Sequence, residues 1–162
     1  MTRWHSFEPV VDARTRVLIL GSLPGVRSLE RSEYYAHPQN GFWRLTGAVA
    51  GLDLAALPYA ERLAALSAAG IGLWDVVASA ERPGSLDSAI RNADANDLGA
   101  LLSGFAGIAA VAFNGQTAAT LAQRQALDTG TRARLILPSS SAAHAVPWQA
   151  KLDKWLALRA WL

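Results

Sequence analysis

Short apolar runs alternate along the chain with segments whose apolar residues recur every three or four positions. Such runs are typical of buried strands, and the longer period is typical of amphipathic helices. The runs predict strands at 17–20, 71–77, 107–113 and 134–137. The periodic segments predict helices at 40–50, 58–69, 96–103, 116–127 and 148–161. We therefore expect residues 1–162 to form a single α/β domain, a three-layer α/β/α sandwich with a central, mostly parallel four-stranded sheet.

Polar and flexible residues gather where these strands end. In open α/β sheets, ligands bind at the carboxyl ends of the strands. The segments at these ends are Gly21-Ser-Leu-Pro-Gly25, Trp74-Asp75, Asn114-Gly115 and Pro138-Ser-Ser-Ser-Ala-Ala-His144. We expect them to converge on one rim of the sheet.

The connection after the first strand is unusually long and contains the run Tyr34-Tyr-Ala-His-Pro-Gln-Asn-Gly-Phe-Trp43. Long connections in compact domains are usually functional or disordered. This one is too aromatic for a disordered linker, so it predicts a binding or catalytic loop. Phe42 and Trp43 stand at a helix start and are expected in the core, whereas Tyr34 and Tyr35 are candidates to stack on a flat ligand.

The amino-acid composition excludes several kinds of site and segment. The 162 residues contain no cysteine, which excludes disulfides, thiolate zinc sites and iron–sulfur clusters and fits a cytoplasmic protein. No apolar run is long enough for a membrane span, and the N-terminal residues do not resemble a signal peptide. Thirteen of the 15 basic residues are arginine, but they are scattered, so charge alone does not predict nucleic-acid binding.

The local motifs disfavour several enzyme classes. The segment Gly21–Gly25 is not a dinucleotide fingerprint, and it lacks the lysine of a P-loop, so we expect no cofactor. His37 and His144 have no defined carboxylate partner, so we expect no metal. Asp75 stands in an apolar strand, and a structural and a functional role are equally open.

The serine-rich loop Ser139-Ser140-Ser141, with His144, has three interpretations. Its hydroxyl and backbone N–H groups could grip a phosphate, or the serines could cap a turn. A serine hydrolase with His144 as base is a third. The pattern G-x-S-x-G of such enzymes is missing, and a serine so close in sequence to its base is not the usual geometry.

Three segments together resemble the uracil-DNA glycosylase superfamily, and most closely its hypoxanthine-DNA (deoxyinosine) glycosylase branch. They are Gly21-Ser-Leu-Pro-Gly25, Tyr34–Trp43 and Leu137-Pro-Ser-Ser-Ser-Ala-Ala-His144. The resemblance covers nearly the whole chain. Mismatch-specific relatives carry a catalytic Asn in a G-I-N-P-G loop, where this chain has Leu23, and Ala142 stands where relatives often carry Pro.

The resemblance implies roles for individual residues. The catalytic role passes to Asn40, which orients the water that attacks the sugar. The base pocket is formed by Gly21, Ser22, Leu23, Pro24, Gly25, Tyr35 and Asn114, with Tyr35 stacking on the flipped base. The DNA backbone is gripped by Ser139, Ser140, Ser141 and His144. For the residue that fills the gap left by the flipped base, Ala143, Val146 and Pro147 are candidates.

The implied function is a monomeric, monofunctional DNA repair glycosylase. It would flip a deaminated base out of double-stranded DNA and hydrolyse its N-glycosidic bond, releasing hypoxanthine from deoxyinosine. Such chemistry requires no metal and no strong nucleophile. The alternatives are a uracil or G·U/T mismatch glycosylase of the same superfamily and a non-catalytic nucleic-acid-binding module.

Overall fold

The chain folds around a four-stranded parallel sheet. A computed structural model describes residues 2–162. Its central strands are β2 (Val17–Gly21), β3 (Ile71–Asp75), β6 (Ala110–Asn114) and β7 (Ala133–Leu137). They pair in the order β3-β2-β6-β7, and every pair is parallel. The predicted four-stranded sheet is confirmed.

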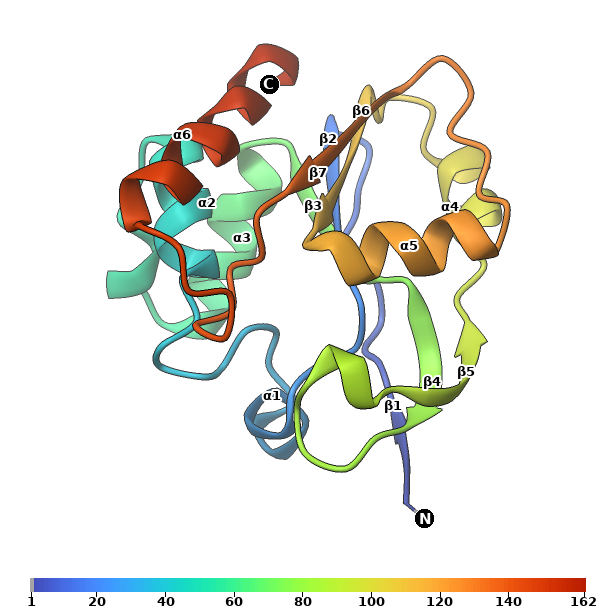
Figure 1. Cartoon of the computed structure of the whole chain (residues 1–162). Helices are drawn as coiled ribbons and strands as arrows, with labels where there is room; N and C mark the ends of the chain where they lie inside the picture. The colour runs from blue at the N-terminus through green and yellow to red at the C-terminus, as the bar shows by residue number, and fades with distance from the viewer. Residues whose placement is uncertain (1) are drawn as a thin grey trace.

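Helices cover both faces of this sheet (Figure 1). One layer contains α2 (Phe42–Ala50), α3 (Tyr59–Ala68) and α6 (Trp148–Leu156), which continues as a 3-10 turn (Ala157–Trp161). The other contains α4 (Leu98–Gly104) and α5 (Gln116–Arg124). The three-layer arrangement is therefore also confirmed. Among residues 2–162, no helix is long and apolar enough to cross a membrane.

The alternation of side chains along β2 divides the core into two halves. Val17 and Ile19 pack with Phe42 and Trp155 in the layer of α2, α3 and α6. Leu18 and Leu20 pack on the opposite face in the layer of α4 and α5. All of these side chains are fully buried, because a parallel strand in the middle of the sheet is covered on both sides.

Three features differ from the sequence-based expectation. A small antiparallel sheet of order β1-β4-β5 is formed by β1 (Arg3–His5), β4 (Val77–Glu81) and β5 (Arg91–Ala95). The strand expected at 71–77 ends at Asp75, and the chain passes into β4 two residues later. A short helix, α1 (Val26–Arg31), interrupts the long connection after β2 at the lower end of the molecule in Figure 1, and its first residue bonds Ser85 in the connection between β4 and β5.

Candidate active site

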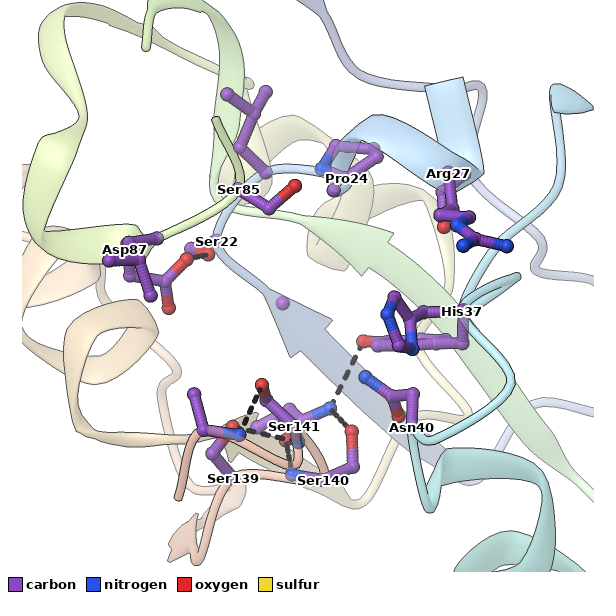
Figure 2. A pocket seen from close by; sticks show the side chains of 18 of the residues that line it. Ser22, Pro24, Arg27, His37, Asn40, Ser85, Asp87, Ser139, Ser140 and Ser141 are labelled. Carbon is purple, nitrogen blue, oxygen red and sulfur yellow. Dashed lines mark hydrogen bonds between the residues drawn. The ribbon is translucent and has the colours of Figure 1, made fainter. Parts of the chain in front are cut away.

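A cleft of about 570 Å³ lies at the carboxyl ends of the parallel strands. Strand β2 has β3 on one side and β6 on the other, so the cleft lies at the topological switch point of the sheet. All four strand ends expected to converge contribute to it, and so does the segment 85–88 (Figure 2). The proposed catalytic residue, the base-pocket residues and the serine loop with His144 all line this cleft, whereas Val146 and Pro147, two of the candidates for the gap left by the flipped base, do not.

Gly21 ends β2 and lines the cleft beside Asp75 and Tyr35. A Cβ atom on Gly21 would lie 2.6 Å from Asp75 Oδ1 and 2.9 Å from Tyr35 Oη. Neither neighbour is the free end of a flexible surface chain, since Asp75 is buried and Tyr35 packs on Phe42. A glycine is thus required for the loop to approach these two polar groups closely.

Hydrogen bonds from Arg82 hold the loop Gly21–Gly25 in place, and Arg82 itself is only 1% exposed. Its guanidinium donates hydrogen bonds to the carbonyl oxygens of Leu23, Pro24 and Gly84. Leu23 packs into a small apolar cluster with residues of β4. Leu23, which stands where the sequence resemblance implies a catalytic Asn in mismatch-specific relatives, is therefore a buried apolar side chain here.

The segment 85–88 closes the same side of the cleft, and sequence reasoning missed it. Ser22 Oγ donates a hydrogen bond of 2.6 Å to Asp87 Oδ1. Ser85 Oγ accepts one of 2.9 Å from the N–H of Val26. The only sequence signal was the turn-forming run Arg82-Pro-Gly-Ser-Leu-Asp-Ser88, which gives no indication of what it covers.

Asp75 is buried at the end of β3, lines the cleft and is 3% exposed. Its Oδ2 atom is buried without a hydrogen-bond partner. Burial raises the pKa of Asp75 to about 7, the Asp87 carboxylate acts in the same direction, and Arg82 opposes them. A carboxyl group with such a pKa is partly protonated at neutral pH, so it can both donate and accept hydrogen bonds.

Asn40 lies at the opposite edge of the cleft, directly before α2. Its Oδ1 accepts a hydrogen bond of 2.9 Å from the N–H of Phe42, and its backbone N–H donates to His37 O. Figure 2 shows its amide nitrogen pointing into the cleft. The neighbouring Gly41 N–H bonds Ser140 O at 2.9 Å, so the serine loop holds Asn40 in place. Within the described residues 2–162, the Asn40 side chain makes only the bond with the Phe42 N–H, so its two amide hydrogens and one oxygen lone pair are available.

The two tyrosines of the loop have different environments. Tyr34 is 4% exposed, and its hydroxyl donates to Glu8 O, so it belongs to the core. The ring of Tyr35 stacks on Phe42 with centroids 3.8 Å apart. Burial raises the pKa of Tyr35, so its hydroxyl stays neutral. The stacking of Tyr35 on a base remains a prediction, and one face of its ring is already covered by Phe42.

Asn114 connects three parts of the cleft. Its Nδ2 donates to Tyr35 Oη at 3.2 Å and to Ser140 Oγ at 2.9 Å, while its Oδ1 accepts from the N–H of Ser140. Both amide hydrogens are thereby engaged with the protein. The contact of Asn114 with a base also remains a prediction, and it would require one of these bonds to be exchanged.

The serine loop is built mainly from its own turn contacts. Ser139 Oγ accepts from Ser141 N–H, and Ser141 Oγ accepts from Ala143 N–H, each at 3.2 Å. Lys151 Nζ donates to Ser141 O. Within residues 2–162, no hydrogen bond joins His144 to any of the three serine hydroxyls, so the Ser–His pair of a hydrolase is not formed. In the same range, no group of three or more His, Asp or Glu side chains is placed to hold a metal.

Comparisons with known proteins agree with this architecture. The family model of the uracil DNA glycosylase superfamily matches residues 8–162. A hypoxanthine DNA glycosylase of Methanosarcina barkeri (strain Fusaro) is 43% identical over 112 residues, which cover 69% of this chain and 71% of the relative. A hypoxanthine DNA glycosylase of Methanosarcina acetivorans is 36% identical over 157 residues, covering 95% of this chain and 96% of the relative.

A solved structure shows the same fold. The solution NMR structure of a candidate uracil DNA glycosylase from Methanosarcina acetivorans superimposes with a TM-score of 0.83 at 34% identity. The match covers 98% of both chains. The sequence, the fold and the position of the cleft therefore agree, and the chain belongs to the uracil DNA glycosylase superfamily.

Proposed function

We propose that this protein is a monofunctional DNA glycosylase that releases hypoxanthine from deoxyinosine in double-stranded DNA. Membership of a superfamily that acts on DNA and the two relatives named hypoxanthine DNA glycosylases support this function. The observation that carries it is the placement of Asn40, held at the edge of the cleft while Leu23 is buried.

The reaction requires few protein groups. The bond from sugar C1′ to the base nitrogen breaks, and its electron pair leaves with the base. A water oxygen then bonds to C1′, and the base gains the proton that the water loses. In our proposal, Asn40 orients this water or supports the developing charge, while groups around the base stabilise its departure. The expected products are free hypoxanthine and an abasic site.

The pocket offers groups that complement hypoxanthine. The base presents an N–H donor at N1 beside an acceptor at O6. A neutral carboxyl group at Asp75, with one donor and one acceptor, matches that edge, and backbone N–H groups of Gly21–Gly25 could reach other acceptors. Uracil presents a similar donor–acceptor edge, so uracil release is the second candidate function.

A panel of duplex oligonucleotides tests this proposal. Each carries one inosine, uracil, xanthine or G·T mismatch, and strand nicking after alkali reports base release. We expect the highest rate with inosine. A higher rate with uracil would establish the alternative, and tight binding without release would indicate a non-catalytic module.

Two variants test the role of Asn40. Asn40→Ala should lower the rate of base release at least about 100-fold, since removing one preorganised polar group commonly costs this much. Asn40→Asp keeps an oxygen for the Phe42 N–H but removes the amide donors, so it separates local structure from chemistry. Unchanged turnover in a correctly folded Asn40→Ala variant would refute the assignment.

We further propose that the enzyme acts as a monomer, because one chain supplies every residue that lines the cleft. The measurement is the molar mass by light scattering at the concentration used for the assay. An active dimer whose dissociation abolishes turnover would contradict this.

A further inference from the structure

A second cavity, of about 380 Å³, adjoins the proposed active site. It lies where the end of α1, the start of α2 and the start of α3 meet. Tyr35, His37 and Asn40 line both this cavity and the cleft. The loop between α1 and α2, which carries Asn40, therefore contacts both spaces.

The second cavity is basic. Arg31, Arg44 and Arg62 line it, against a single carboxylate, Glu33. Among residues 2–162, none of these arginines forms an ion pair, and the guanidinium groups of Arg31 and Arg44 donate no hydrogen bond to the protein. Arg62 donates from Nε to Leu57 O and from Nη2 to a second carbonyl oxygen, which fixes its guanidinium but leaves Nη1 free.

A buried donor also lacks a partner here. Trp43 lines the cavity and is 4% exposed, yet its Nε1–H group is buried without an acceptor. The guanidinium of Arg62 lies over the Trp43 ring, 5.5 Å from its centroid. A buried N–H without an acceptor costs free energy, so such groups are rare in native proteins. An anionic ligand in the cavity would pair with the arginines, and it would lie next to Trp43, which lines the same space.

We propose that this cavity binds a phosphodiester group of the DNA strand and thereby helps to hold the loop of Asn40 in place. Arginine forks match the oxygen atoms of a phosphate. The DNA source is favoured because the cavity adjoins the cleft for the flipped base. It is also favoured because Arg44 lies 4.2 Å over Trp148, just beyond the serine loop. The identity of the ligand as DNA rests on the proposed function.

Salt-dependent binding to an undamaged duplex tests the proposal without requiring base release. The variant is Arg31→Gln combined with Arg44→Gln. The matched control is Arg124→Gln combined with Lys154→Gln, which removes the same charge from two exposed residues that line neither cavity. We expect the slope of log Kd against log salt to fall by about one unit in the cavity variant, as for one lost phosphate contact, and to change less in the control.

Two further measurements identify the ligand. Neutral methylphosphonate groups placed one at a time along the duplex should reveal one position that weakens binding of the wild type several-fold but not of the cavity variant. The indole N–H resonance of Trp43 should shift when DNA is added, and less with inorganic phosphate at equal charge.

Equal slopes in the cavity variant and the control would overturn the proposal. A Trp43 resonance that responds to inorganic phosphate but not to DNA would assign the cavity to a free phosphate ligand and also overturn it. If the slope falls as expected but hypoxanthine is not released from an inosine duplex, the proposed function fails and the phosphate site stands.

Discussion

The two loops that form the rims of the cleft are held in place by hydrogen bonds from different kinds of side chain. The first rim, Gly21–Gly25, rests on the buried guanidinium of Arg82 and on the carboxylate of Asp87. The second rim, Ser139–His144, rests on the neutral amide of Asn114, on backbone hydrogen bonds and on the ammonium group of Lys151, which donates to Ser141 O. Charged supports in a dry site respond to ionisation, whereas an amide does not titrate. The contribution of the buried carboxyl groups to the first rim should therefore depend on pH, whereas the contribution of the Asn114 amide to the second should not.

We expect the largest loss of stability when the guanidinium of Arg82 is removed. Arg82→Ala leaves three carbonyl oxygens without their donor, and it leaves Asp75 and Asp87 without a nearby cation. Breaking a buried charged network typically costs about 3–5 kcal/mol. We expect a loss of that size in the free energy of unfolding, measured with urea.

Two controls accompany this measurement. Arg82→Lys keeps the charge but not the fork and should lose an intermediate amount. Arg124→Ala removes an exposed arginine of α5 and should change stability by no more than about 0.5 kcal/mol. A loss below about 1 kcal/mol in Arg82→Ala would show that the guanidinium does not support the first rim.

The second prediction is that the free energy of unfolding depends on pH because of Asp75. Its pKa in the fold is about 7, above the ordinary value of 3.8, so the folded state favours the protonated form. The free energy of unfolding should therefore be highest at low pH, fall as the pH rises from about 4 to about 7, and then level off. Each unit of pKa difference is worth about 1.4 kcal/mol, so the total is on the order of 4 kcal/mol.

The control for this prediction is a carboxylate far from the cleft. Asp75→Asn should flatten the fall between pH 4 and 7, whereas Asp53→Asn, at an exposed position, should leave it unchanged. Burial also raises the pKa of Asp87, so a smaller fall of the same sign should persist in Asp75→Asn. A wild-type protein whose stability rises over this range would contradict the proposed state of Asp75.

The elements that could be predicted from the sequence are those with a local pattern of apolar or polar residues. The strand at 17–20 was found because a buried parallel strand is a continuous apolar run. The strand at 134–137 lies at the edge of the sheet and is only partly buried, but its run Leu135-Ile-Leu137 is still apolar. The serine loop was recognisable because its polar residues follow a strand directly. By contrast, β5 is Arg91-Asn-Ala-Asp-Ala95, with every residue exposed, so no hydrophobic pattern marks it.

The supports of the first rim were also hidden from sequence reasoning. A buried arginine becomes meaningful only once the carbonyl groups around it are known, and those of Leu23 and Pro24 lie about sixty positions away. Only the first residue of β4, Val77, was read as the end of the preceding strand, because Val76 and Val77 continue the apolar run, and the rest of β4 was not predicted. Tertiary hydrogen bonds leave no local period in a sequence.

The third prediction concerns the support of the second rim. Asn114→Ala removes the bonds to Tyr35 Oη, Ser140 Oγ and Ser140 N–H. Because each buried bond contributes about 1 kcal/mol, we expect a loss of about 2–3 kcal/mol. The loss should be the same at pH 5 and pH 8, unlike the effect of Asp75. Ser140→Ala, which removes only the side-chain partner, should lose about 1 kcal/mol, and a pH-dependent loss in Asn114→Ala would erase the difference between the rims.

The smallest effect comes from making the same substitution in each rim. Ser85→Ala removes the acceptor of Val26 N–H beside the first rim, and Ser139→Ala removes the acceptor of Ser141 N–H within the second. Both bonded donors are backbone groups at partly exposed positions, where water can replace the lost hydroxyl. We expect each variant to lose about 0.5–1 kcal/mol in urea unfolding, independently of pH. If the loss grows with pH in Ser85→Ala alone, the ionisation of Asp87 affects the whole segment 85–88. The pH-sensitive part of the cleft would then be larger than Asp75 and its direct neighbours.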